Sequence, residues 1–420
     1  MKMISDIAKL SVTVLSTAII LLSSLQTYYN IKIMREHEKL LSSNAYHSQR
    51  RSSLGIVVIT PCAVKYMRRV DLEKFVSSLR YLSGSRIVER IFVVVDDEND
   101  IDLFRRIARD LVNNNIVTRI SDEKICQECS GKNRAILTIL RDLYKEHEED
   151  KIVLVMDCDA EFLGIDEKLY GVSGVLNDLG NAIVTSYRWY TIRDTCSLMY
   201  NLVSSMFFEV LLSNKTRIVW GGFMGFSKNK SLIYGVPEEL SREIADDATI
   251  RRVFTRYSAQ IIFCPQCIGF SSVECSSSWF REFVSWATRQ LLMIRIYTPR
   301  GFRIVFAGYF LLFSLNIAPL AMALVSVEIS LLALVSLFVP MLLVGLVKNL
   351  ALVAYLSRLH PRSHVYESIL WLVAYLFLAS LRSLFVAPLL VKTILTRELI
   401  WRGKRYCIYK QRQGLKMLMC

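Results

Sequence analysis

The sequence predicts an α/β domain joined to α-helical transmembrane segments. Between residues 54 and 276, short runs rich in Val and Ile alternate with stretches of helical periodicity, which is typical of a sheet with parallel strands. Elsewhere, several long stretches lack charged side chains and are long enough to cross a hydrocarbon core of about 30 Å. With 420 residues, the chain can hold both a complete α/β domain and a membrane region.

The first predicted elements alternate between strand and helix. The run LGIVVIT at residues 54–60 is rich in β-branched side chains and ends at a proline, so we expect a strand. Residues 70–82 place apolar side chains on one helical face, and residues 91–95, IFVVV, form the next strand. A second helix is expected from residue 100 to about residue 112, and a third from residue 130 to about residue 147.

The strand expected at residues 152–156 points to a functional site. Its five apolar residues fit a strand buried on both faces, and they run directly into Asp157 and Asp159. Ligands of such sheets bind outside the carboxyl ends of the strands, where two carboxylates can hold a divalent cation against phosphate oxygens. The alternative is a polar exit from the strand. Asp100 and Asp102 have the same spacing, which we interpret as the start of a solvated helix.

Later in the domain, glycines and a second acidic pair follow. A further strand is expected at residues 182–187. After it comes the segment Trp220, Gly221 and Gly222, whose glycines allow the backbone to approach a ligand closely. A helix at residues 241–255 carries Asp246 and Asp247 near its start.

The membrane region is predicted from four apolar stretches. Residues 10–31, 304–327 and 329–347 contain no charged side chain, and residues 368–391 contain only one, Arg382. The fourth stretch could instead lie in the membrane interface or form a re-entrant pair. Residues 277–297 are aromatic and basic, which suits an amphipathic interfacial helix.

Basic residues predict the orientation of the chain. A cluster of them follows the first apolar stretch, so the positive-inside rule places residues 54–297 in the cytoplasm. The tail beyond residue 391 is also basic and should be cytoplasmic, which requires an even number of crossings after the domain. Three candidate crossings leave the topology there open. Juxtamembrane Lys and Arg account for most of the net charge of +14, so we expect no nucleic-acid partner.

The cysteines leave three alternatives open. The sequence contains two Cys-x-x-Cys pairs. Cys126 and Cys129 form the first, and Cys264 and Cys267 form the second. The two pairs are far apart in the sequence, unlike the compact spacing of small zinc modules. Structural zinc, disulfides and isolated thiols are all possible, and we favour isolated thiols because cytosolic thiols are normally reduced.

Five short motifs follow one another along the chain, in the order VVVDDEND, GKNRA, DCD, WGG and ADDAT. In this order the chain resembles the membrane-bound members of glycosyltransferase family 2, most of all the ceramide glucosyltransferase-like enzymes and their prokaryotic relatives. The resemblance covers most of residues 54–300 and returns at residues 401–406, WRGKRY. It implies a GT-A-type, Rossmann-like catalytic domain that binds a nucleotide sugar together with Mg²⁺ or Mn²⁺.

The resemblance also implies residue roles for the donor. Asp96 or Asp97 would contact the uracil or ribose, and the choice between them is open. Lys132 and Arg134 match the basic residues near the diphosphate, with exposed helix charges as the alternative. Asp157 matches the contact to the donor sugar or nucleotide. The metal ligands would be Asp159 and Asp157.

For catalysis, the resemblance points to the second acidic pair. Asp247 matches the proposed general base, because an inverting transfer needs a carboxylate that takes the proton of the acceptor hydroxyl. Asp246 beside it could raise the pKa of Asp247 through like-charge repulsion. The alternative is that both are ordinary first-turn acids that complement the helix dipole.

The acceptor side departs from the family pattern. Family members carry Gln/Arg-x-x-Arg-Trp just before the membrane, and here Trp286 is present but Glu282 and Ser285 replace the polar and basic residues. Arg289 and Gln290 lie one helical turn further on and could substitute, with Arg289 facing the diphosphate. The acceptor-binding set implied by the resemblance is therefore Trp220, Gly221, Gly222, Trp286 and Gln290.

These observations predict an inverting, metal-dependent hexosyltransferase in the cell membrane. It would move a sugar from a cytoplasmic UDP- or GDP-hexose, such as UDP-glucose, to a lipid or lipid-linked acceptor, as in glycolipid biosynthesis. Alternatives are a processive polysaccharide synthase and a transporter or receptor with a nucleotide-binding domain. The expected domains are a transmembrane helix (1–31), a basic linker (32–53), the catalytic domain (54–276), an interfacial helix (277–300), a transmembrane region (301–392) and a basic cytoplasmic tail (393–420).

Overall fold

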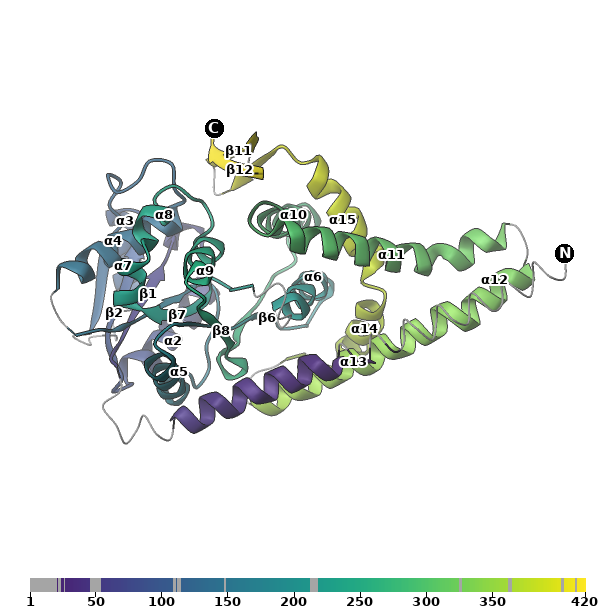
Figure 1. Cartoon of the computed structure of the whole chain (residues 1–420), viewed down its shortest axis with the longest axis horizontal. Helices are drawn as coiled ribbons and strands as arrows, with labels where there is room; N and C mark the ends of the chain where they lie inside the picture. The colour runs from purple at the N-terminus through teal and green to yellow at the C-terminus, as the bar shows by residue number, and fades with distance from the viewer. Residues whose placement is uncertain are drawn as a thin grey trace. The chain divides into compact units, whose positions relative to one another are not determined.

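The computed structural model describes residues 21, 24–25, 27–45, 54–108, 111, 115–146, 149–211, 218–324, 327–361, 365–401, 404–411 and 414–420. It forms two compact units, drawn in Figure 1. The first, here called the α/β unit, comprises Met34–Trp189, Val210–Ser272 and Arg397–Cys420. The second, the helical unit, comprises Tyr190–Glu209 and Val273–Thr396 together with the chain up to Ile33. Most of the predicted first membrane stretch, and residues 46–53 of the predicted linker, lie outside the described residues.

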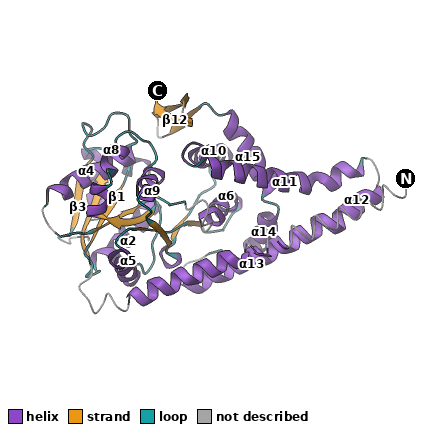
Figure 2. Cartoon of the chain, viewed as in Figure 1, coloured by secondary structure: helices purple, strands orange, loops and turns teal. Residues whose placement is uncertain are grey.

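A seven-stranded sheet forms the centre of the α/β unit (Figure 2). Its strand order is β3-β2-β1-β4-β7-β5-β8. The strands β1, β2, β3 and β4 pair in parallel, whereas β7 runs antiparallel to both β4 and β5. The strand bounds are β1 Ile56–Pro61, β2 Val88–Val95, β3 Ile116–Ile120, β4 Ile152–Met156, β5 Ala182–Thr185, β7 Phe223–Ser227 and β8 Gln260–Phe263. This sheet, with helices between its parallel strands, confirms the predicted α/β class.

Helices cover both faces of the sheet, which explains why β4 is apolar at every position. Successive strand residues point to opposite faces. Val153 and Val155 pack with residues of α4 (Gly131–Lys145) and α9 (Asp246–Arg256). The alternate residues of β4 pack with α2 (Arg69–Ser83) and α5 (Asp166–Leu179). All five side chains of β4 are buried, as the sequence predicted.

Several predicted boundaries were wrong. The helix expected from residue 100 is α3, Glu98–Ile107, because the side chain of Asp97 accepts the N–H of Asp100 and caps it. Asp100 is buried rather than solvated, and its Oδ1 accepts the N–H of Lys65 at 3.0 Å. The helix expected at residues 241–255 begins later, at Asp246 of α9, because residues 241–245 connect it to a separate short helix, α8 (Val236–Leu240).

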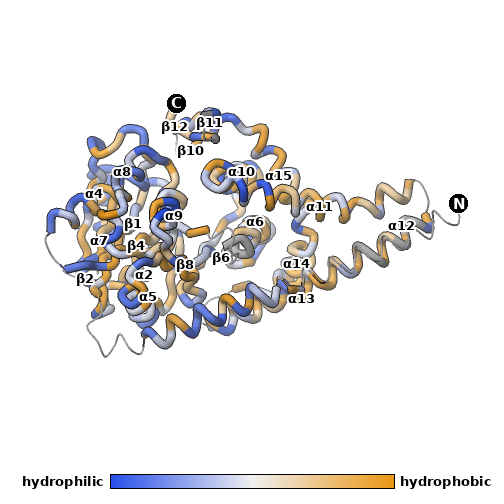
Figure 3. Tube along the Cα trace, viewed as in Figure 1, coloured by the Kyte–Doolittle hydropathy of each residue, from blue (hydrophilic) through white to orange (hydrophobic). Residues whose placement is uncertain are grey.

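Among the described residues of the helical unit, two helices are long and apolar enough to cross a membrane. They are α11, Pro299–Ala323, and α13, Val339–Leu359. The apolar stretch 329–347 covers α12 (Val327–Ala333), a π-helical turn (Leu334–Phe338) and only the first part of α13. Figure 3 shows the apolar residues that run along these helices.

The fourth apolar stretch is broken. It forms α14, Ile369–Ser380, and α15, Ser383–Leu395, which meet at an angle of 58° and count as a third crossing only if the bent pair is one span. The same unit contains α6 (Thr195–Leu211) and α10 (Trp279–Tyr297). The segment predicted to be an interfacial helix forms α10, so its helical structure is confirmed.

The C-terminal residues form a small antiparallel sheet of three strands. These are β10 (Glu398–Trp401), β11 (Lys404–Gln411) and β12 (Gly414–Met419). A disulfide joins Cys407 of β11 to Cys420, just beyond β12.

The expectation of isolated thiols was wrong for both Cys-x-x-Cys pairs. Each pair forms a disulfide, and the Cα atoms lie 5.8 Å apart in Cys126–Cys129 and 5.3 Å apart in Cys264–Cys267, within the range that a disulfide bridges. Cys196 and Cys275 form a further disulfide in the helical unit. Two buried cysteines, Cys62 and Cys158, are free thiols.

Candidate active site

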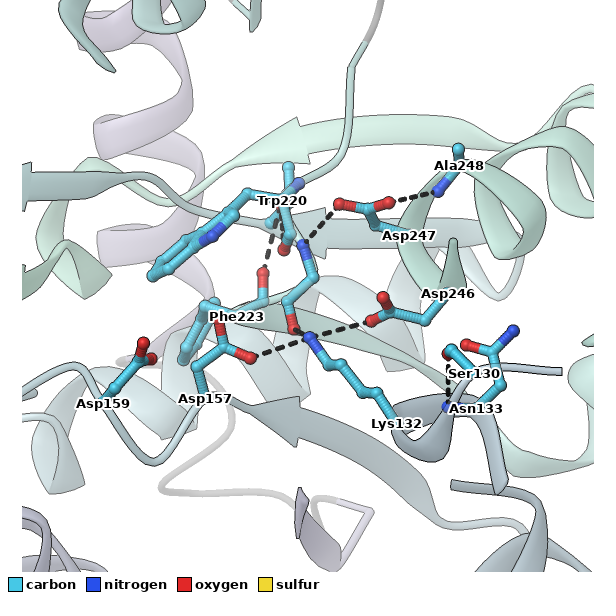
Figure 4. A network of polar contacts seen from close by, with 12 residues as sticks. Ser130, Lys132, Asn133, Asp157, Asp159, Trp220, Phe223, Asp246, Asp247 and Ala248 are labelled. Atoms are coloured by element: carbon cyan, nitrogen blue, oxygen red, sulfur yellow. Dashed lines mark hydrogen bonds and ion pairs between the residues drawn. The ribbon is translucent and has the colours of Figure 1, made fainter. Parts of the chain in front are cut away.

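The carboxyl end of β4 meets the start of β7, because the two strands run antiparallel. Met156 pairs with Phe223, and the N–H of Asp157 donates to the carbonyl oxygen of Gly222 at 3.0 Å. The motifs DCD and WGG therefore lie side by side at one edge of the sheet, although about sixty residues separate them in the sequence. The first turns of α4 and α9 reach the same edge (Figure 4).

Lys132, in the first turn of α4, connects these segments. Its Nζ lies 2.7 Å from Oδ1 of Asp157 and 3.0 Å from Oδ2 of Asp246, and it donates to the carbonyl oxygen of Gly221 at 3.0 Å. Figure 4 shows the ammonium group between the two carboxylates. Burial alone would lower the pKa of Lys132, but the charges of Asp157 and Asp246 outweigh it and raise this pKa, so the side chain stays charged.

Asp247 is the second residue of α9 and accepts two backbone N–H groups. Its Oδ2 accepts from Gly221 at 3.1 Å, and its Oδ1 accepts from Ala248 at 2.6 Å. Burial, followed by repulsion from the charge of Asp246, raises the pKa of Asp247 to about 7. A carboxyl group with this pKa can accept a proton near neutral pH, which is the property a general base needs.

The two glycines of WGG are required by close packing. A Cβ on Gly221 would approach Nζ of Lys132 to 3.1 Å and would meet the carboxylate of Asp246. A Cβ on Gly222 would approach Oδ2 of Asp157 to 2.7 Å and would overlap the ring of Trp220. Any larger side chain at either position would therefore displace the acidic residues of the site.

Arg188 also belongs to this cluster, although no motif in the sequence predicted it. It lies in β6, Arg188–Tyr190, just beyond β5. Its Nη2 donates to Asp157 at 2.7 Å and to Asp159 at 2.6 Å, and its Nη1 donates to the other oxygen of Asp159 at 3.0 Å. The guanidinium group lies 5.4 Å from the ring centre of Trp220. The sequence signal that could have identified Arg188 is its position directly after the strand expected at residues 182–187, because ligands bind where such strands end.

The acid pair has the right chemistry for a cation, but its oxygens are in use. Carboxylate oxygens are the ligands that Mg²⁺ and Mn²⁺ prefer. Here Lys132 binds one oxygen of Asp157, and Arg188 binds the other together with both oxygens of Asp159. As the side chains lie, a cation could bind both carboxylates only by displacing Arg188 from them.

One other group of possible metal ligands occurs among the described residues. It consists of Asp194, Cys196 and Cys275. Because the two sulfurs form a disulfide, they are not available as thiolate ligands.

Asp96 and Asp97 differ in what they do. The side chain of Asp97 caps α3, and its Oδ2 also accepts a hydrogen bond from Nζ of Lys65 at 3.3 Å. Both contacts stabilise the start of this helix. Asp96 is exposed, and a Cβ on Gly131, the first residue of α4, would lie 4.0 Å from its carboxylate. Asp96 is therefore the better placed of the two for a ligand at the start of α4.

The ion pair described for Arg134 is with Glu123 and not with Asp157 or Asp246. Its guanidinium group lies 3.7 Å from Glu123, and within the described part of the chain its buried Nε has no hydrogen-bond partner. A buried donor without a partner is costly, which leaves Arg134 a candidate for contact with a bound nucleotide.

The remaining predicted residues belong to the helical unit. Trp286 packs against Tyr190 and Tyr200, with ring centres 5.6 and 4.7 Å apart. Arg289 and Gln290, one turn further along α10, are half-buried. Their roles toward the diphosphate and the acceptor stay predictions.

Comparisons with known proteins give only distant similarities. No protein-family model matches the chain, and no curated protein sequence matches it. Among solved structures, 4-diphosphocytidyl-2C-methyl-D-erythritol synthase from Anaerococcus prevotii is 16% identical, with a TM-score of 0.34 over 57% of this chain and 96% of that one. Mannosyl-3-phosphoglycerate synthase from Rubrobacter xylanophilus is 14% identical, with a TM-score of 0.30 over 60% and 78%. The bifunctional glycosyltransferase WbbM is 16% identical, with a TM-score of 0.31 over 51% of this chain and 39% of that one. Similarity at this level does not identify a function.

Proposed function

We propose that the protein is an inverting glycosyltransferase embedded in the membrane. It would transfer a hexose from a cytoplasmic UDP- or GDP-sugar to a lipid or lipid-linked acceptor. The observation that carries the proposal is Asp247, a half-buried carboxyl group whose pKa is raised to about 7 and which accepts the backbone N–H of Gly221. The positively charged Lys132 lies at the same edge of the sheet.

In the proposed reaction, Asp247 acts on the acceptor and Lys132 acts on the leaving diphosphate. The acceptor oxygen would attack C1 of the sugar while the bond from C1 to the diphosphate oxygen breaks and the acceptor proton passes to Asp247. Lys132 supports the proposal because it brings a fixed positive charge to the side where the diphosphate would leave. Asp96, at the start of α4, is our candidate for the contact to the nucleoside.

A membrane acceptor is supported by the helical unit. Both α11 and α13 are long and apolar enough to cross a membrane, and they follow α10, whose Trp286 matches the family's acceptor element. An acceptor with a lipid tail would keep that tail in the hydrocarbon. Mg²⁺ or Mn²⁺ is an expected cofactor because of the carboxylate oxygens of Asp157 and Asp159.

The first test is turnover by the purified protein in lipid extract with UDP-glucose, UDP-galactose, UDP-N-acetylglucosamine and GDP-mannose. We expect one donor to yield a labelled glycolipid, and Asp247→Asn to lower kcat by at least about a hundredfold, as loss of a general base does. Chelation with EDTA should also lower turnover.

The matched control is Asp178→Asn, which removes an exposed carboxylate from α5 and should leave turnover unchanged. Full activity in Asp247→Asn would contradict the role of Asp247. If no donor is bound or turned over, the glycosyltransferase proposal fails.

A further inference from the structure

Arg188 holds the acid pair more tightly than a surface ion pair would. Three hydrogen bonds, between 2.6 and 3.0 Å, join its guanidinium group to three of the four oxygens of Asp157 and Asp159. Two of them form a fork on Asp159, the arrangement in which arginine binds a carboxylate most strongly. The side chain of Arg188 is 16% exposed, and the ring of Trp220 lies against it.

The same fork is suited to a diphosphate. The planar guanidinium group binds phosphate oxygens through two parallel N–H donors, as it binds a carboxylate. A diphosphate bound at this edge would therefore compete with Asp159 for Arg188. A divalent cation would compete with Arg188 for the oxygens of Asp157 and Asp159, because a cation and a guanidinium group need the same lone pairs.

We infer that Arg188 is a phosphate-binding residue whose guanidinium group rests on Asp157 and Asp159, where it excludes divalent cations until a diphosphate draws it away. The diphosphate part of this inference rests on the proposed function. The competition with cations does not, since it follows from the hydrogen bonds alone. A nucleoside diphosphate and a cation would then each strengthen the binding of the other, as linkage requires.

The experiment measures Mn²⁺ binding to the full-length protein by electron paramagnetic resonance, with and without UDP or GDP. In Arg188→Gln, Mn²⁺ alone should bind about tenfold or more tightly than in the wild type, because the carboxylates have lost their competitor. The same substitution should weaken the binding of UDP or GDP and reduce the mutual strengthening between nucleotide and Mn²⁺. Arg188→Lys, which keeps the charge but loses the fork, should fall between the two.

A matched control is Arg252→Gln. Arg252 also bridges two carboxylates of the α/β unit, Glu239 and Glu243, at 2.8 and 2.9 Å, but it is half-buried on α9 and neither of these ion pairs involves Asp157 or Asp159. It should leave Mn²⁺ binding unchanged, and thermal unfolding of both variants checks that they are folded.

The outcomes separate the two proposals. Unchanged or weaker binding of Mn²⁺ alone in a folded Arg188→Gln protein would overturn the inference. Nucleotide affinity that is equal in the wild type and Arg188→Gln would overturn its phosphate-binding part. If neither UDP nor GDP binds to any variant while Mn²⁺ binds more tightly to Arg188→Gln, the competition stands and the proposed function fails.

Discussion

Asp247 combines two influences that oppose each other. It lies at the N-terminus of α9 and accepts two backbone N–H groups, both of which favour its ionised form. Burial and the neighbouring charge of Asp246 favour the neutral form and win, since the pKa of Asp247 is raised to about 7. The protein therefore keeps this carboxyl group ready to take up or release a proton at physiological pH.

The pKa of Asp247 predicts a pH dependence. A general base must be ionised, so kcat/KM for the labelled donor should rise with pH and reach half of its plateau near pH 7. A profile already flat from pH 5 upward would contradict this prediction.

Thermal unfolding gives a check that needs no substrate. The pKa of Asp247 is higher in the folded protein than its unfolded value of about 3.9, so ionisation of this group opposes folding increasingly as the pH rises from 4 to about 7. The Tm of Asp247→Asn relative to that of the wild type should therefore increase between pH 5.5 and pH 8.5.

Local motifs predicted some residues of the cluster and could not predict others. Asp157 directly follows a buried strand, so a short stretch of sequence is enough to find it, whereas Lys132 and Asp247 were predicted from the resemblance of GKNRA and ADDAT to family motifs. Arg188 could not be found in this way, because its position depends on the path from β5 to β6 and on pairing with a segment thirty residues earlier. Likewise, only the structure shows that Asp97 caps α3 while Asp96 is exposed.

Among the elements, α5 makes a close contact with the N-terminal helix, which is described up to residue 45. A Cβ added to Gly171 of α5 would lie 2.5 Å from the carbonyl oxygen of Leu41, and backbone cannot move aside as a flexible side chain can. The side chain of Leu41 is itself buried in the core beneath α5. This packing attaches the N-terminal helix to the sheet.

We predict that Gly171→Ala forces these two helices apart and destabilises the protein by about 1–3 kcal/mol, the usual cost of overpacking. The measurement is Tm in detergent. Gly308→Ala, on α11, is the matched control, since a Cβ there meets nothing within 4 Å and alanine favours a helix over glycine. An equal or higher Tm for Gly171→Ala would show that the helices do not pack so closely.

The strands differed in how well the sequence predicted them. Strands β1, β2 and β4 are buried on both faces, so their continuous runs of Val and Ile were clear. Strand β3 lies at the edge of the sheet with every side chain at least partly exposed, so it lacks this signal and was missed. The start of the helix predicted at residues 241–255 was wrong for another reason, because periodicity alone does not mark where α9 begins after the connection from α8.

At the scale of the whole molecule, the C-terminal sheet bears on the membrane topology. Strands β10, β11 and β12 belong to the α/β unit, although the membrane-length helices separate them from the rest of it in sequence. A single compact unit lies on one side of a membrane. For the membrane protein proposed above, the chain between Val273 and Thr396 would then cross an even number of times, and we propose that α11 and α13 are these two crossings.

This topology predicts that the bent pair α14–α15 enters and leaves the membrane on the same side. In sealed vesicles of known orientation, an epitope after Cys420 should be protected from protease together with the α/β unit. An epitope between α11 and α12 should show the opposite accessibility. A C-terminal epitope on the side opposite to the α/β unit would mean that α14 and α15 form a third crossing.

The antiparallel pairing of β4 with β7 divides the site between two stretches of the gene. Asp96, Lys132 and Asp157 are encoded before β7, in the run of parallel strands, whereas Gly221 and Asp247 are encoded with β7 and the helices that follow it. Recombination at a point between the codons for β4 and those for β7 would thus exchange one of these two groups of residues and leave the other unchanged. Under the proposed function, the segment between β4 and β7 is therefore a crossover point for chimeras that would combine the donor preference of one protein with the acceptor preference of another.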